Sequence, residues 1–304
     1  MSVLNLCPTL PKSLHKPLRW IGAALLVGLL QGCANTTDSG AIGLQRSQLL
    51  LISSEELNAK AAQGFQQLSA DAQSKKKLNT DARLTQRVRR IGNDLIAQVS
   101  VFRADAKDWD WEINVFDSDE INAFCAPGGK IGVYTGIVKR LKLTDDELAA
   151  VMGHEIAHAL REHSREKASQ QMVSNLLVTT VSAAAKVDGS LLDMGSQMFV
   201  HLPNSRSMEL ESDVMGLELM ARAGYDPRNA PKLWEKMRAA SGGNKGLAFM
   251  STHPADEERI AAMQENIPKV AHLYEEARAR KAASAGKRAP AARKKGSGKP
   301  QKSQ

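Results

Sequence analysis

The chain has 304 residues, of which 42% are hydrophobic, and this is enough to bury a core in one large domain or two small ones. Its three cysteines exclude a scaffold held together by many disulfides. The formal net charge of +8 comes from the two ends, because residues 1–32 carry three Lys or Arg, residues 278–304 carry ten and no acid, and residues 33–277 are left with −5.

The N-terminus has the layout of a secretory signal. Basic residues precede an apolar run of eleven residues that begins at Trp20, whereas a helix that crosses a bilayer needs about 20. The run ends in Leu-Gln-Gly-Cys, which resembles the lipobox of bacterial lipoproteins. We therefore expect residues 1–32 to be a lipoprotein signal peptide, Cys33 to carry the lipid, and residues 33–44 to form a polar tether. A plain signal peptide with a chance cysteine is the alternative.

The apolar pattern predicts two helices, a strand and a strand–turn–strand unit, over residues 45–68, 79–100, 109–117 and 121–138. The stripe of the second helix consists of Leu84, Val88, Ile91, Leu95 and Val99. After Thr144 the pattern is helical almost to the end. Residues 45–277 are therefore expected to form one α+β domain, a small β-sheet followed by a mostly helical part. The strand at Lys130–Gly136 is expected to be an edge strand that pairs with an extended peptide, and an edge strand without that role is the alternative.

The helix that begins at Thr144 carries the pattern His-Glu-x-x-His. Thr144 and Glu147 form a capping box that starts it. His154 and His158 are four residues apart and lie on one face, where both can bind one ion. Glu155 is about 100° around the helix from His154 and can act as a general base, because zinc lowers the pKa of water to about 7. The alternative is an ordinary surface helix, which the apolar neighbours of the histidines disfavour.

A third metal ligand has to come from elsewhere in the chain. The metzincin extension needs a glycine at position 161 and a histidine at position 164, where this chain has Arg161 and Ser164. His163 is out of register and is expected to be solvated at the helix end. Residues 204–227 are predicted to form a helix that contains Glu209, and two His with one Glu is a set that holds catalytic zinc.

Glu209, and not Glu211, is expected to be that ligand, because the two side chains lie about 200° apart around a helix. Glu209 shares its face with Asp213, which is placed to accept a hydrogen bond from a ligand histidine. The face of Glu211 leads to a Glu218–Arg222 pair at i,i+4, which is typical of a solvated surface.

Four segments carry a resemblance to a known family; they are INAFCAPGGKIGVYTG, HEIAHALREH, SRSMELESD and STHPADEERI. They are similar to the zinc metallopeptidase family of HtpX, the CAAX prenyl endopeptidases, BepA and LoiP. The chain resembles most the LoiP-like periplasmic lipoproteins, because the membrane helices of HtpX and the helical repeats of BepA are absent from it. The resemblance implies a gluzincin-type domain with one Zn2+ per chain. It also implies that His154, His158 and Glu209 bind zinc, that Glu155 is the base, and that Asp213 orients the site.

Further groups are expected near the site. Residues 191–205 are interpreted as a flap, in which His201 is a loop residue and not a ligand. Arg206 is expected to hydrogen-bond substrate or an acidic group beside the ligands. His253 precedes Pro254 and several acids, which is typical of a helix cap, whereas the resemblance implies that it approaches the zinc and holds a resting state.

These observations predict a zinc-dependent metalloendopeptidase of misfolded or damaged envelope proteins, anchored by its N-terminal lipid on the periplasmic side. Ala34, in place of Asp, favours the outer membrane of a Gram-negative host. The quality-control role rests on the resemblance alone. Residues 278–304 are expected to be a disordered tail that is either solubilising or binds anionic lipid or cell-wall polymer; nucleic acid is not an expected partner of an exported protein. The alternative function is a lipoprotein that binds cell wall or lipid through this tail and has a closed or non-catalytic zinc site.

Overall fold

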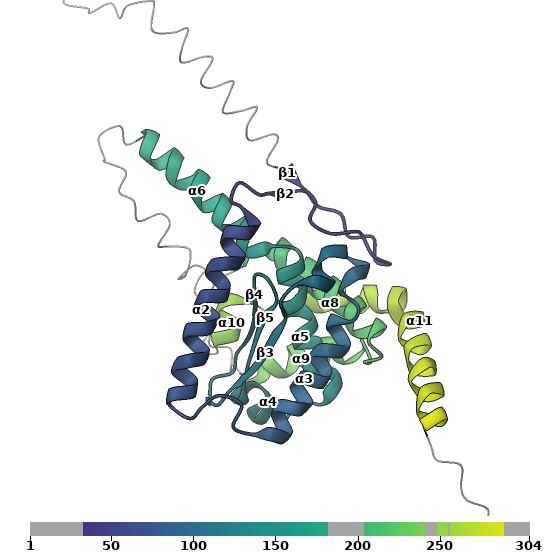
Figure 1. Cartoon of the computed structure of the whole chain (residues 1–304). Helices are drawn as coiled ribbons and strands as arrows, with labels where there is room; N and C mark the ends of the chain where they lie inside the picture. Colours follow the sequence, from purple (N-terminus) through teal and green to yellow (C-terminus); the bar gives the residue numbers. More distant parts are fainter. Residues whose placement is uncertain (1–32, 182–203, 241–247, 255, 289–304) are drawn as a thin grey trace, which may run out of the picture.

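The computed structural model describes residues 33–181, 204–240, 248–254 and 256–288 (Figure 1). This part of the chain is mostly helical with a small sheet, which confirms the α+β prediction. The elements are β1 (Cys33–Ala34), β2 (Gln48–Leu49), α2 (Ser54–Ser74), α3 (Ala82–Ile96), the 3-10 helices η1 (Val99–Val101) and η2 (Ala104–Asp108), β3 (Glu112–Phe116), β4 (Ala123–Ala126), β5 (Lys130–Tyr134), α4 (Thr135–Arg140), α5 (Asp145–Leu160), α6 (His163–Val181), α8 (Arg206–Arg222), α9 (Asn229–Ala240), α10 (Ala248–Thr252) and α11 (Glu257–Arg288).

The two predicted N-terminal helices are present with different boundaries. The Asp81 side chain accepts a hydrogen bond from Leu84 N at 3.0 Å and starts α3, and the predicted apolar stripe of this helix is buried along its whole length. The first predicted helix was wrong over residues 45–53, because α2 begins only after its N-cap, Ser53. Residues 48–49 form β2 instead and pair with β1.

The sheet has the order β3-β5-β4, with β3 parallel and β4 antiparallel to β5. The prediction that Lys130–Gly136 is an edge strand was therefore wrong. β5 lies in the centre of the sheet, because β3 pairs with the side of it that the β4–β5 hairpin leaves open. Figure 1 shows α2 on one side of the sheet and α3 and α5 on the other. The edge strand that contacts α5 is β4.

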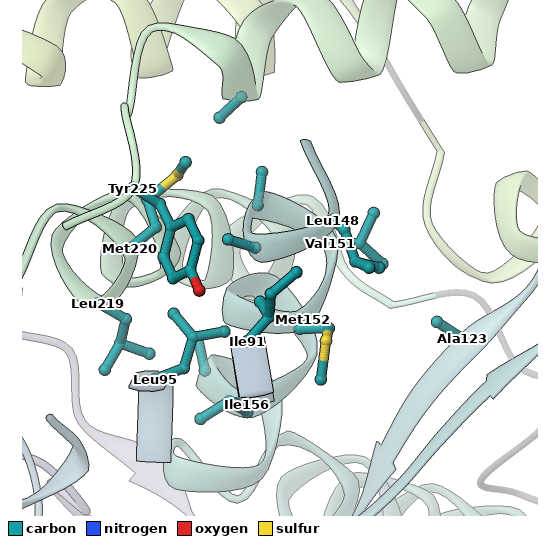
Figure 2. Packing of buried hydrophobic residues seen from close by; sticks show 14 of the residues in the cluster. Ile91, Leu95, Ala123, Leu148, Val151, Met152, Ile156, Leu219, Met220 and Tyr225 are labelled. Atoms are coloured by element: carbon teal, nitrogen blue, oxygen red, sulfur yellow. The ribbon is translucent and has the colours of Figure 1, made fainter. Parts of the chain in front are cut away.

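The main core lies between the sheet, α3, α5 and α8. Figure 2 shows Ile91 of α3, Met152 of α5 and Leu219 of α8 among the side chains of one apolar cluster. Helix α5 is buried from Glu147 to Leu160, so hydrophobic burial holds it on all sides.

Two glycines bring α5 and α8 close together. A Cβ added to Gly216 of α8 would lie 3.0 Å from the backbone N of His154 and 3.2 Å from its Cα. A Cβ on Gly153 of α5 would lie 3.2 Å from the carbonyl O of Gly216. The two backbones therefore approach one another at the turn of α5 that carries the histidine motif.

The N-terminal segment (residues 33–49), whose first part was expected to be a free tether, lies against the domain. Oδ1 of Asn35 accepts a hydrogen bond from Arg161 Nη1 at 2.6 Å, and Ala41 N donates to Glu218 Oε2 at 2.8 Å. Buried polar side chains of α5 and α8 thus take their partners from this segment. The expected signal peptide, residues 1–32, lies outside the described residues.

The expected disordered tail is helical over its first part. Helix α11 continues to Arg288, and Lys281 ties it to the body through Asp94 Oδ2 at 2.9 Å and through the ring of Tyr225 at 4.8 Å. Ala, Lys and Arg are good helix formers, which explains the extension. Residues 289–304 lie outside the described residues. Over the part of the chain that the structure describes, no helix combines the length and the apolar character that a membrane span requires.

Gly216→Ala should lower the free energy of unfolding by about 1–3 kcal/mol, the usual cost of overpacking, because the new methyl group meets backbone atoms of α5. Gly64→Ala in α2 is the matched control, since no atom lies within 4 Å of its added Cβ. It should gain about 0.5–1 kcal/mol from a better helix former. Urea unfolding measures both values, and two equally stable variants would contradict the close packing of α5 on α8.

Candidate metal centre

Helix α5 places the His-Glu-x-x-His motif in the interior of the protein. The predicted capping box is confirmed, because Glu147 N donates to Thr144 Oγ1 at 3.2 Å and Thr144 N donates to Glu147 Oε2 at 2.8 Å. His154, Glu155 and His158 are only 3%, 4% and 8% exposed. The ordinary surface helix is therefore excluded, and these polar side chains need buried partners.

The two motif histidines meet a glutamate of α8 at one point. Nε2 of His158 lies 3.1 Å from Nε2 of His154 and 3.3 Å from Oε1 of Glu209. His253, which follows α10, brings its Nδ1 to 3.0 Å from Oε1 of Glu209 and 3.3 Å from Nε2 of His154. One ligand atom from each of these four residues lies within 4.8 Å of the others, so the cluster can hold a metal ion.

Two buried carboxylate oxygens beside the cluster, Oε1 of Glu155 and Oε2 of Glu209, make no hydrogen bond with the described residues. Nη1 of Arg259 lies 2.7 Å from Oε2 of Glu209, so this oxygen is ion-paired, although the contact lacks hydrogen-bond geometry. Imidazole nitrogens and a carboxylate are ligands that zinc takes, so the residues fit a zinc ion.

Burial and close neighbours shift the pKa values of these groups. Burial raises the pKa of Glu155, the candidate base. Burial alone would also raise the pKa of Glu209, but the histidines of the cluster outweigh it and hold the pKa well below its usual value. Burial lowers the pKa of His158 well below its usual value, so its ring is neutral and offers a lone pair. For His154, Asp213 and Glu209 outweigh burial and raise the pKa to about 9.

Asp213 and Arg259 lie behind His154. Oδ1 of Asp213 is 2.9 Å from Nδ1 of His154, the contact that the helix register predicts. Nε and Nη2 of Arg259 donate to the two carboxylate oxygens of Asp213, each at 2.7 Å, and the guanidinium lies 3.9 Å above the ring of Trp234. The sequence reasoning missed Arg259. Its one signal was a cation in the first turn of a helix, where the helix dipole opposes it and an anionic partner is required.

The start of α8 differs from the prediction in its polar contacts. The side chain of Arg206 is 63% exposed and pairs with Glu258 at 2.6 Å, so the expected contact with a group beside the ligands was wrong. Asn204 takes that place, because its Nδ2 donates to Oε1 of Glu209 at 2.6 Å and its Oδ1 accepts from Lys167 at 2.9 Å. The expected flap lies outside the described residues as far as residue 203, and His201 with it.

The side of α8 that carries Glu211 is buried and not solvated, so this prediction was wrong, as was that for His163. Glu211 is 5% and His163 1% exposed, and Oε2 of Glu211 lies 2.9 Å from Nε2 of His163. Arg46 and Arg161 also pair with this carboxylate. These neighbours hold the pKa of Glu211 at about 2, although burial alone would raise it. The N-terminal segment, whose Arg46 covers this face, is the reason for its burial.

The Glu218–Arg222 pair forms as predicted, with 2.7 Å between Oε1 and Nη2. Glu218 is nevertheless fully buried. The N-terminal segment lies against it, and the backbone N–H groups of Ala41 and Ile42 donate hydrogen bonds to its Oε2. A side-chain pair at i,i+4 therefore did not indicate a solvated face here.

Strand β4, at an edge of the sheet, runs past the helix that carries Glu155. Asn122 O accepts from Tyr134 N in the neighbouring β5, and hydrogen-bonded and non-hydrogen-bonded residues alternate along an antiparallel pair. The backbone groups of Ala123 and Cys125 therefore face away from β5. Helix α5, which carries Glu155, packs against β4, so this strand borders the helix of the candidate base.

Comparison with known proteins places this geometry in a family. A model of peptidase family M48 matches residues 82–267, which is more than half of the chain. The chain is 41% identical over 162 residues to the mitochondrial metalloendopeptidase OMA1 of Schizosaccharomyces pombe, an alignment that covers 53% of this chain and 48% of that protein. It spans about half, or less, of the length of the OMA1 proteins from fission yeast, Arabidopsis thaliana and Saccharomyces cerevisiae.

Two bacterial proteases are also similar. The metalloprotease LoiP of Escherichia coli is 25% identical over 256 residues, which cover 80% of this chain and 96% of LoiP. The beta-barrel assembly-enhancing protease of Yersinia pestis is 26% identical over 192 residues, which cover 60% of this chain and 38% of that protein. The resemblance found in the sequence motifs is thus confirmed, and the residues that the family model matches include the histidine motif, Glu209 and His253: the chain belongs to peptidase family M48.

Proposed function

We propose that the protein is a zinc-dependent endopeptidase that hydrolyses peptide bonds of unfolded or misfolded cell-envelope proteins. One observation carries the proposal: a buried glutamate with an open oxygen, Glu155, lies next to two histidines and a glutamate that can hold one ion. A purely structural zinc site needs no base at this position. The family supports the peptidase activity, and the similarity to a beta-barrel assembly-enhancing protease supports envelope proteins as substrates.

In this proposal His154, His158 and Glu209 hold the zinc, and Asp213 orients His154. Zinc, when bound, supplies the Lewis acidity that makes water acidic enough to be deprotonated near neutral pH. Glu155 takes one proton from a water molecule while the oxygen of that water forms a bond to the peptide carbonyl carbon. Glu155 then gives that proton to the amide nitrogen as the C–N bond breaks, so the leaving group departs as a neutral amine.

The substrate backbone is proposed to pair with the outer edge of β4. Two features support this position: β4 is an edge strand of the sheet, and it packs against α5, the helix that carries Glu155. Pairing through main-chain groups recognises an extended chain with little dependence on its side chains. An unfolded segment offers such a chain and a folded protein does not, which agrees with misfolded proteins as substrates.

Glu155→Gln should abolish peptide hydrolysis while the zinc content stays near one per chain, because the base is lost and all three proposed ligands remain. Hydrolysis of unfolded casein, with and without chelator, measures activity, and metal analysis of the purified variant measures zinc. Glu265→Gln, an exposed position on α11, is the control and should keep both. Activity in the zinc-loaded Glu155→Gln variant would refute Glu155 as the base.

His253 bears on the alternative of a closed, non-catalytic site. With its Nδ1 among the ligand atoms, it can take the coordination position that water needs, and a zinc site with four protein ligands is structural. We propose that His253 holds a resting state that substrate displaces.

The basic end of α11 and the tail after it are proposed to contact anionic lipid or cell-wall polymer, which is compatible with either function.

His253→Ala should raise casein turnover severalfold without lowering the unfolding midpoint, because the position it occupies becomes free for water. The comparison of kcat with the midpoint of urea unfolding separates this role from a structural one. An inactive wild type whose His253→Ala variant is also inactive, at full zinc content in both, would favour the closed site. Unchanged kinetics would leave His253 as a residue that only ends α10.

Membrane attachment is proposed to occur through a lipid on Cys33, on the periplasmic side and in the outer membrane. The lipobox-like sequence supports this. Cys33 pairs with Leu49 in the short sheet of the N-terminal segment, so a lipid there would sit directly at the domain and not at the end of a free tether.

Cys33→Ser should leave a soluble protein or an uncleaved precursor in place of a mature membrane-bound form, because the thiol that carries the lipid is gone. Fractionation of cells followed by a salt wash measures the distribution, with Cys125→Ser as the cysteine control. Retention of the Cys33→Ser protein in washed membranes, with the signal removed, would place the anchor elsewhere.

A further inference from the structure

The ring of His158 has a second nitrogen that faces away from the cluster. Its Nδ1 lies 2.8 Å from Nδ1 of His163, and Nε2 of His163 lies 2.9 Å from Oε2 of Glu211. All three side chains are buried, with exposed fractions of 8%, 1% and 5%. The contacts form a chain from a cluster histidine through a second histidine to a carboxylate.

The hydrogen positions of this chain follow from the ligand role of His158. Its Nε2 faces His154 and Glu209, so a metal takes the lone pair of Nε2 and the neutral ring carries its hydrogen on Nδ1. That hydrogen has one acceptor at 2.8 Å, Nδ1 of His163. His163 then carries its own hydrogen on Nε2 and donates it to the carboxylate of Glu211. The Ser212 hydroxyl also lies near Nδ1 of His163, at the longer distance of 3.3 Å, so the ring N–H of His158 is the closer donor to that nitrogen.

We propose that His163 and Glu211 are positioning residues that fix the tautomer and the ring orientation of His158 for zinc binding; this rests on the proposed function, in which His158 is a ligand. His154 is already backed in a comparable way, by Asp213 and the guanidinium of Arg259. A ligand histidine held by an outer carboxylate is a common arrangement in zinc sites. For His158 the outer carboxylate is that of Glu211, which does not contact the His158 ring directly; His163 lies between the two and hydrogen-bonds to both.

Glu211 is itself held by two arginines. Arg46 contacts both of its carboxylate oxygens, with 3.0 Å between Nη2 and Oε2, and Nε of Arg161 lies 3.1 Å from Oε2. Arg46 belongs to the N-terminal segment, which also binds Arg161 through Asn35. The chain that begins at a metal ligand thus ends in the segment that follows Cys33.

Four variants of the mature full-length protein test the proposal. His163→Phe keeps an aromatic ring and loses the acceptor. His163→Asn puts a carbonyl oxygen close to the position of Nδ1 and is the conservative rescue. Glu211→Gln removes the charge that fixes His163. Glu218→Gln is the matched control, because Glu218 is also a buried glutamate of α8 that pairs with an arginine and with the N-terminal segment, but contacts none of the described histidines.

The measurements are the Kd for Zn2+ by competition with a chelator, the visible absorption spectrum with Co2+ in its place, and urea unfolding of the metal-free protein. His163→Phe and Glu211→Gln should weaken Zn2+ binding about 10–100-fold and change the Co2+ spectrum. His163→Asn should restore part of the affinity, and Glu218→Gln should bind as the wild type does. A structural role alone would lower the unfolding midpoint and leave the Co2+ spectrum of the folded protein unchanged.

A wild-type Kd and Co2+ spectrum in both His163→Phe and Glu211→Gln would overturn the proposal, and so would equal weakening by Glu218→Gln. Where His163→Phe does not fold, His163→Asn and Glu211→Gln decide by the same two readouts. Glu209→Ala separates this failure from failure of the proposed function. If Glu209→Ala binds Zn2+ as the wild type does, the metal centre itself is wrong; if it loses Zn2+ while the His163 and Glu211 variants are normal, only the positioning role falls.

Discussion

The close contact between α5 and α8 is the constraint on which the rest of the structure depends. Neither helix carries the whole set of candidate ligands, since His154 and His158 lie on α5 and Glu209 lies on α8. Their ligand atoms converge within a few ångströms only because Gly153 and Gly216 let the two backbones approach. Apolar side chains around this contact bury both helices, so the hydrophobic effect that stabilises the fold also fixes the spacing of the ligands.

Burial of both helices forces every charge near the contact to find a partner. An unpaired buried charge costs several kcal/mol, and α8 carries Glu209, Glu211, Asp213 and Glu218 in its interior-facing turns. Arginines from three other segments and one at the end of α8 itself neutralise them; they are Arg46, Arg161, Arg259 and Arg222. These pairs explain how a helix with so many acids is buried, and they hold the side chains around the metal centre in single positions.

The sequence predicted the features that depend on residues a few positions apart. The capping box before α5 and the shared face of His154 and His158 follow from helix geometry, and so does the position of Glu209, rather than Glu211, in the cluster. It did not predict features that depend on distant partners. His163 and Arg259 are buried by contacts with α8 that span about 50 residues of sequence. β5 is the central strand because it pairs with β3, although β4 lies between the two in the sequence. Local periodicity carries no information about such contacts.

The N-terminal segment shows the same limit with a consequence for function. The composition of its first part, residues 33–44, is that of a solvated spacer, yet Asn35 bonds to Arg161 and Ala41 to Glu218. Directly after this part, Arg46 contacts Glu166 and Glu211. A lipid on Cys33 would therefore be joined to the domain through residues that also hold the carboxylate behind His163. Loss of these contacts would leave Glu211 with Arg161 and His163 as its remaining charged or polar partners. A lipid anchor on Cys33 and the carboxylate behind His163 would then share one set of buried ion pairs, so such an anchor would not be mechanically independent of the site.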